Sequence, residues 1–152
     1  TDELIVSPWQ QSDAIGDFEL VAVVAKDHPL ISEKFLTAEH FADQTLLTYP
    51  VATNQLDIFT HCLNPAQVSP KLIKHVKNSH VILQMVAAHM GIAVLPNWLV
   101  NTLALQSLLD VIPITANGLS KNLYMRYNKN DKAINAIQSL CPRVQQAFKQ
   151  LV

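Results

Sequence analysis

The stretch KNSHVILQMVAAHMGIAVLPNWLV, residues 77–100, carries the clearest structural pattern of the sequence. Asn78 and Ser79 are residue types that cap helices, and the apolar run behind them predicts a helix buried on nearly all sides. Gly91 separates this helix from a short aliphatic run that begins at Ile92 and predicts a strand. Glycine tolerates a left-handed backbone, so we expect Gly91 to end the helix. The stretch therefore predicts the helix–strand unit of an α/β fold.

Strand-like and helical segments alternate on both sides of this stretch. Short apolar runs ended by proline or polar residues predict strands at residues 3–7, 18–30, 45–50, 71–76, 92–95, 108–114 and 123–128. Helical spacing predicts helices at residues 37–44, 54–63, 79–90, 97–106 and 133–152, the last one kinked or broken by Pro142. Residues 8–17 read as a linker between strands. Such alternation predicts an α/β domain with a largely parallel sheet.

Composition restricts the function classes. The 152 residues are 49% hydrophobic and 15% charged, with a net charge of −1, which is typical of a globular protein. No cluster of lysines and arginines exists, so the chain by itself is a poor nucleic-acid binder. There is no membrane-spanning run and no basic leader, and Cys62 and Cys141 match no disulfide or zinc pattern. We therefore expect two reduced thiols in a cytoplasmic protein, with no membrane contact.

Ligands of parallel sheets collect where strands end and helices begin. Residues 48–54 (TYPVATN), 76–80 (VKNSH) and 95–98 (LPNW) are three such junctions. Tyr49 ends its strand where the hydroxyl can reach a ligand, although a core aromatic with a hydrated hydroxyl is the commoner arrangement.

The junction at residues 76–80 has two readings. Free N–H groups of Ser79, His80 and Val81 at a helix start suit a carboxylate, and Lys77 and His80 add positive charge. The simpler reading is that Asn78 or Ser79 only caps the helix, because most capped helices bind nothing.

Enzyme signatures are missing from the sequence. It contains no GxSxG, P-loop, GxGxxG or HExxH motif. His61 and Cys62 are neighbours on a helix and point about 100° apart, so they do not form a nucleophile–base pair. His80 and His89 share one helix at a spacing that is not used for metals. The sequence favours a binding module over an enzyme.

Four segments carry a family resemblance, namely residues 18–30 (FELVAVVAKDHPL), 45–51 (TLLTYPV), 76–96 (VKNSHVILQMVAAHMGIAVLP) and 123–130 (LYMRYNKN). In order and spacing they resemble the effector-binding region of LysR-type transcriptional regulators. The resemblance implies an α/β, periplasmic-binding-protein-like (type II) fold of two subdomains, here one complete subdomain plus part of the other. Residues 1–23 would end the first regulatory subdomain and cross over, 24–122 would form the second, and 123–152 would return to the first. The DNA-binding winged helix-turn-helix is absent from this chain.

Residues 45–70 narrow the resemblance to family members that activate methionine biosynthesis genes. This implies homocysteine as the regulatory ligand in the cleft between the subdomains, with no cofactor and no metal. The expected effector-binding residues are Ser7, Tyr49, Pro50, Val51, Asn78, Ser79 and His80. The alternative is a solute-binding protein for a small amino acid, and an enzyme with the same two-lobed fold comes third.

The resemblance also implies partners. The full-length protein would be a homodimer or tetramer and would bind DNA only through the absent N-terminal domain. The helices at residues 56–63 and 81–90 are the expected elements of self-association.

Overall fold

The computed structural model describes residues 7–101 and 107–151 of the chain. Two compact units are present: Glu19–Leu119 form one, and the described parts of Thr1–Phe18 and Ser120–Val152 form the other. The subdomain boundaries expected after residues 23 and 122 stay predictions.

The sheet has the strand order β3-β2-β4-β1-β5, and β6 also pairs with β1. Its strands are β1 (Gln10–Ala25), β2 (Thr45–Thr48), β3 (Leu72–His75), β4 (Ile92–Pro96), β5 (Leu109–Pro113) and β6 (Ser120–Asn128). β2 runs parallel to β3 and β4, whereas β1 runs antiparallel to β4 and β5. The predicted parallel sheet is therefore correct for β2, β3 and β4 and wrong at β1. A continuous apolar run indicates that both faces of a strand are covered. It does not indicate whether the neighbouring strands run parallel or antiparallel to that strand.

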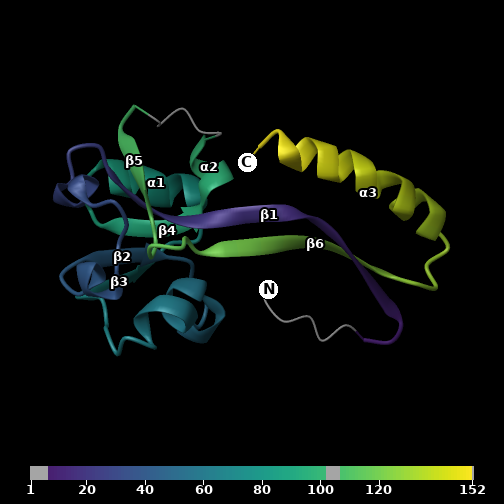
Figure 1. The fold of residues 1–152 in the computed structure, drawn as a ribbon, viewed down its shortest axis with the longest axis horizontal. Helices are drawn as coiled ribbons and strands as arrows, with labels where there is room; N and C mark the ends of the chain where they lie inside the picture. The colour runs from purple at the N-terminus through teal and green to yellow at the C-terminus, as the bar shows by residue number, and fades with distance from the viewer. Residues whose placement is uncertain (1–6, 102–106, 152) are drawn as a thin grey trace. The chain divides into compact units, whose positions relative to one another are not determined.

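Side chains of the sheet alternate between two hydrophobic clusters, one on each face. Val21 and Val23 of β1 face a cluster with the helix α1 (Ser79–Ala87), which contributes Ile82, Leu83 and Val86. Ala22 and Val24 face the other cluster, to which the connections before and after β2 contribute Leu36, Phe41, Ile58, Phe59 and Leu63. The sheet of this unit is thus covered on both faces (Figure 1).

Residues 77–100 form the predicted helix and strand, with two corrections. α1 is not buried all round, because Val81 on its first turn is 43% exposed. The left-handed residue that follows the helix is His89, with φ of 57°, rather than Gly91. Gly91 has φ of 152°, and a Cβ atom there would collide with the carbonyl oxygen of Thr45. Glycine is needed for this close approach to β2, not for the helix cap.

The connection between β2 and β3 holds short helices rather than one α-helix. It contains η3 (Thr53–Gln55) and the π-helix η4 (Ile58–Leu63). The apolar side of η4 lies in the core of its own unit, since Ile58, Phe59, Cys62 and Leu63 are buried. The expectation that this helix offers an apolar face for self-association is therefore wrong.

Of the short elements near β2, η2 (Ala38–Phe41) begins after Thr37, as predicted. η1 (Pro29–Ser32) was not predicted, because the strand expected at residues 18–30 ends at Ala25. α2 (Asn97–Asn101) is the described beginning of the helix expected at 97–106.

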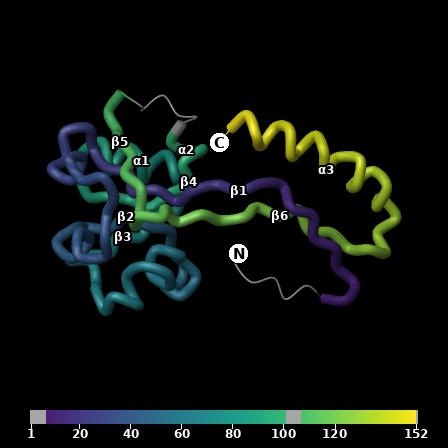
Figure 2. Tube along the Cα trace, in the orientation of Figure 1, coloured from purple at the N-terminus to yellow at the C-terminus, as the bar shows by residue number. Residues whose placement is uncertain are grey.

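The other unit contains the first half of β1, β6 and α3 (Ile134–Lys149). β1 and β6 lie side by side along their length in this unit (Figures 1 and 2). The expected linker at residues 8–17 is wrong, because β1 already begins at Gln10. Asp13 of β1 accepts a hydrogen bond of 2.6 Å from the Tyr127 hydroxyl. Pro142 lies inside α3, which continues through it. The strand expected at residues 3–7 lies outside the described residues, apart from Ser7.

Candidate effector-binding site

The candidate site lies at one edge of the sheet in the unit Glu19–Leu119. β2, β3 and β4 run in the same direction, so the residues that follow them meet at this edge. Thr48 at the end of β2 is the register partner of His75 at the end of β3. The Val76 N–H donates to the Thr48 carbonyl at 2.8 Å and continues the pairing to the start of the junction at residues 76–80. The first two junctions therefore begin side by side.

Tyr49 and Ser79 connect the first two junctions directly. The Tyr49 hydroxyl oxygen lies 2.8 Å from Ser79 Oγ, and either one can be the donor. The Tyr49 ring is partly buried and packs against the hydrophobic cluster that contains α1. Whichever hydroxyl donates, the other keeps its own hydrogen for a further acceptor. The pair therefore presents a hydroxyl donor at the start of α1.

Asn78 acts as the N-cap of α1. Its Oδ1 accepts from the His80 N–H at 2.8 Å and from the Val81 N–H at 3.4 Å. The expectation of three free amides is therefore wrong for His80 and Val81, because a capping side chain satisfies the groups that a ligand would use. Among the described residues, the Ser79 N–H has no such partner.

The other expected residues have different surroundings. Pro50 is exposed, Val51 is 39% exposed, and the Val51 N–H donates to the Tyr49 carbonyl at 2.8 Å. His80 is exposed on the first turn of α1. Ser7 belongs to the other unit, where its carbonyl accepts from the Gln10 N–H. The ligand role of all seven residues stays a prediction.

Two residues of this edge were missed by sequence reasoning. His75 Nδ1 lies 3.2 Å from the Tyr49 carbonyl oxygen, so an imidazole borders the first junction. At the third junction, Asn97 Oδ1 accepts from the Trp98 N–H at 2.8 Å. The signal for His75 was its place as the last residue of a short strand, where side chains reach the same edge as the junctions.

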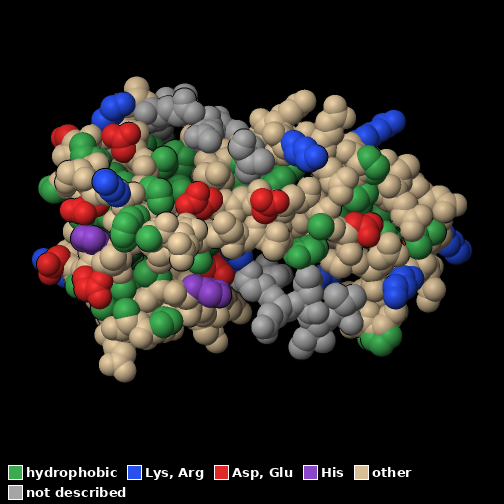
Figure 3. All heavy atoms as spheres, viewed as in Figure 1, with side chains coloured by type: hydrophobic (Ala, Val, Ile, Leu, Met, Phe, Trp, Pro, Cys, Tyr) green, Lys and Arg blue, Asp and Glu red, His purple; other side chains and the backbone are tan. Residues whose placement is uncertain are grey.

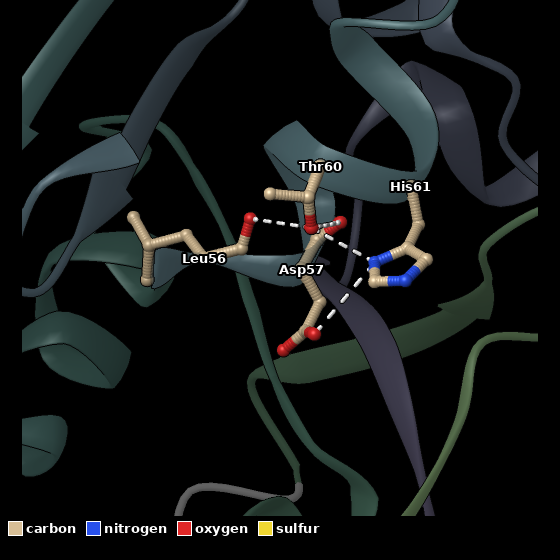
Figure 4. Close-up of polar contacts among 4 residues, drawn as sticks. All are labelled: Leu56, Asp57, Thr60 and His61. Atoms are coloured by element: carbon tan, nitrogen blue, oxygen red, sulfur yellow. Dashed lines mark hydrogen bonds and ion pairs between the residues drawn. The ribbon is translucent and has the colours of Figure 1, made fainter. Parts of the chain in front are cut away.

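A cluster of Asp57, Thr60 and His61 resembles a catalytic triad in residue types (Figure 4). His61 Nδ1 lies 2.8 Å from Thr60 Oγ1 and 3.7 Å from Asp57 Oδ1. In a proton relay the carboxylate and the hydroxyl contact opposite ring nitrogens, whereas here both contact Nδ1. Neighbouring Cys62 is buried, and burial raises the pKa of its thiol, which disfavours the nucleophilic thiolate. This geometry does not support nucleophilic catalysis.

Acidic and basic side chains are both scattered over the face drawn in Figure 3. Residues 7–101 and 107–151 contain no group of three or more His, Cys, Asp or Glu placed to hold a metal ion. Within the same ranges, no helix has the length and apolar character needed to cross a membrane.

The model of the LysR substrate binding domain family matches residues 4–149. The chain belongs to this family. It is 45% identical over 116 residues to the HTH-type transcriptional regulator MetR of Salmonella typhimurium, and 46% identical over 108 residues to MetR of Escherichia coli K12. These matches cover 76% and 71% of this chain but 36% and 33% of the two relatives, so the chain spans about a third of their length.

Solved structures agree with this assignment. The regulatory domain of MetR, a LysR family regulator from N. meningitidis, is similar with a TM-score of 0.84 and 30% identity, over 96% of this chain and 67% of that one. Full-length BenM shares the fold, with a TM-score of 0.74 at 21% identity, over 97% of this chain and 49% of that one. The expected type II periplasmic-binding-protein-like fold is confirmed, and the relatives are transcriptional regulators rather than enzymes.

Proposed function

We propose that this chain is the effector-sensing region of a transcriptional regulator of methionine biosynthesis and that it binds homocysteine at the edge where β2 and β3 end. The observation that carries the proposal is the 2.8 Å contact between the Tyr49 hydroxyl and Ser79 Oγ, which joins the two expected junctions. The similarity to MetR of Salmonella typhimurium and Escherichia coli supports the choice of ligand.

The start of α1 supplies the groups for the carboxylate of homocysteine. The Ser79 N–H and the spare hydroxyl hydrogen of the Tyr49–Ser79 pair are the donors, while Asn78 holds the next two amides of the helix. The positive end of the helix dipole adds about 0.3–1 kcal/mol to the binding of an anion. Lys77, which directly precedes Asn78, contributes further positive charge.

Pro50 and Val51 provide the apolar surface for the side chain. Both are exposed at the end of β2, next to Tyr49. A thiol is soft and weakly polar, so an apolar wall is sufficient for it. In the proposal, the partner of the ammonium group lies outside the residues that follow β2, β3 and β4.

The proposal is tested by calorimetric titration of the full-length protein with L-homocysteine, L-methionine and L-cysteine. Homocysteine should bind in a saturable way and more tightly than the other two amino acids. A Ser79→Pro variant removes one N–H at a helix position that tolerates proline, so the fold should survive while affinity falls several-fold. Unchanged binding in this variant would mean that the junction at residues 76–80 is only a helix cap.

A solute-binding protein for a small amino acid is the alternative, because it shares the architecture. The similarity to named transcriptional regulators favours the sensor. A reporter gene under a methionine biosynthesis promoter separates the two, since only the sensor makes transcription depend on homocysteine. Turnover of an amino acid by the full-length protein would instead support an enzyme.

The assembly is part of the proposal. We infer that the full-length protein is a cytoplasmic homodimer or tetramer that binds DNA through its N-terminal domain. Of the two helices considered for self-association, α1 keeps exposed apolar side chains, with Val81 43% exposed. A Val81→Glu variant should shift the protein towards the monomer in sedimentation velocity, and a monomeric parent protein at tens of micromolar would contradict the inference.

A further inference from the structure

A polar pocket of about 200 Å³ opens at the opposite edge of the same sheet, where β2, β3 and β4 begin. Thr45 is the first residue of β2, and Lys71 and Gly91 directly precede β3 and β4. His28, from the segment after β1, and His89, from the segment after α1, also line it. None of the seven expected effector residues is among its walls, so this pocket is separate from the candidate effector site.

Two opposite charges on the pocket wall have no partner. Asp43 and Lys71 both line the pocket, and in the part of the chain that the structure describes neither one lies within ion-pair distance of the other or of any further charge. The imidazole of His89 differs, since its Nε2 lies 3.2 Å from Asp27 Oδ1. Both unpaired charges are therefore available to a ligand that carries a cation and an anion.

The walls around these charges are fixed by the backbone. Gly91, with φ of 152°, lies so close to the Thr45 carbonyl that no larger residue fits. His89 holds a left-handed conformation and is anchored by Asp27. His28 Nδ1 accepts from the Leu30 N–H at 3.2 Å, and the His28 side chain also has a hydrogen bond with Gln44 of the pocket wall. These contacts order the backbone around the pocket before a ligand binds, although the side chains of Asp43 and Lys71 are exposed.

We propose that this pocket binds a small zwitterion, an α-amino acid, with its ammonium group on Asp43 and its carboxylate on Lys71. The imidazoles of His28 and His89 lie beside the bound molecule. The volume is below the roughly 300–1,000 Å³ typical of pockets for drug-sized ligands, which restricts the ligand to a short side chain. This second site does not depend on the proposed homocysteine site.

The test uses the full chain with isotope-labelled histidine and follows the ring signals of His28 and His89 by NMR. L-serine and L-methionine are the probes, and acetate and ethylammonium are controls that carry one charge each. At least one amino acid should shift both ring signals in a saturable way, with an affinity about tenfold or more above that of either control, because each control loses one charged contact. Equal responses to amino acids and controls, or no response, would overturn the proposal.

Variants test whether Asp43 and Lys71 bind the amino acid or are only solvated surface charges. Asp43→Asn and Lys71→Gln should each weaken binding about tenfold or more. Glu33→Gln and Lys34→Gln alter exposed charges outside the pocket and should have no effect. Tyr49→Phe should also leave these shifts unchanged, which distinguishes this pocket from the effector site. Unaltered binding in both pocket variants would show that Asp43 and Lys71 hold only water.

Discussion

Tyr49→Phe combined with Ser79→Ala tests the contact on which the candidate site rests. Tyr49→Phe removes only the hydroxyl that lies 2.8 Å from Ser79 Oγ, and the ring keeps its packing against the cluster around α1. No cavity forms, so the change in stability reports on the hydrogen bond alone. Ser79→Ala removes the other hydroxyl. Ser79 is half-buried and is the first residue of α1.

The expected magnitude follows from the kind of bond. A hydrogen bond between neutral groups contributes a net of about 0.5–1.5 kcal/mol, and this one is only partly buried, which places it near the lower end. Each single variant should therefore lose about 0.5–1 kcal/mol of unfolding free energy. The double variant should lose about as much as one single variant, because both substitutions remove the same bond.

Urea unfolding of the four proteins measures the coupling energy, and calorimetry measures homocysteine affinity in parallel. Each single variant should bind homocysteine several-fold more weakly. Tyr124→Phe is the matched control, because Tyr124 is 39% exposed and its hydroxyl has no hydrogen bond among the described residues. Strictly additive losses of stability would show that the two hydroxyls do not interact in solution. Unaltered affinity in both variants would remove this edge as the effector site.

Three further predictions concern the unit Glu19–Leu119. Gly91→Ala should lower the unfolding free energy by about 1–3 kcal/mol in urea titrations, since alanine is strained at φ of 152° and meets the Thr45 carbonyl; an unchanged midpoint would contradict this contact. Burial is the main effect that lowers the pKa of His28, so the folded state binds a proton less readily than the unfolded state. The stability that neutral His28 contributes to the folded state is complete above about pH 6.5 and is lost as the pH falls towards the folded pKa. The urea midpoint should therefore fall with the pH over this range, and it should fall less in a His28→Asn variant. Cys62 should react slowly with a thiol reagent at neutral pH until urea unfolds the chain, because burial raises its pKa; rapid labelling of the folded protein at this residue would show the burial to be wrong.

Most elements of the fold could be predicted, because the spacing of apolar residues along a segment indicates which side of that segment is buried. The strands β2, β3 and β4 and the helix α1 lie where apolar runs and a capping residue placed them. The direction of β1 could not be predicted, because a strand covered on both faces has the same apolar run in either orientation. Residues 8–17 looked like a linker because they are the longest irregular piece of the sequence, yet Asp13 within them is satisfied by Tyr127, more than a hundred positions away.

In the candidate site, too, some features could be predicted from the sequence and others could not. The register of Thr48 with His75 follows from parallel neighbours, so the meeting of the two junctions was predictable. That Asn78 occupies two amides of α1 was one of two open readings, and only its side-chain geometry decides between them. The role of Gly91 needed the structure as well, because the nearby carbonyl belongs to Thr45, on a different strand.

Calorimetric titration of the full-length protein with L-homocysteine, compared between the parent and Tyr49→Phe, tests the central claim most directly. We expect saturable binding to the parent, several-fold weaker binding to Tyr49→Phe, and no change in the control Tyr124→Phe. Absence of binding to the parent, or equal affinity in the parent and Tyr49→Phe, would contradict the claim that homocysteine is sensed where β2 and β3 end.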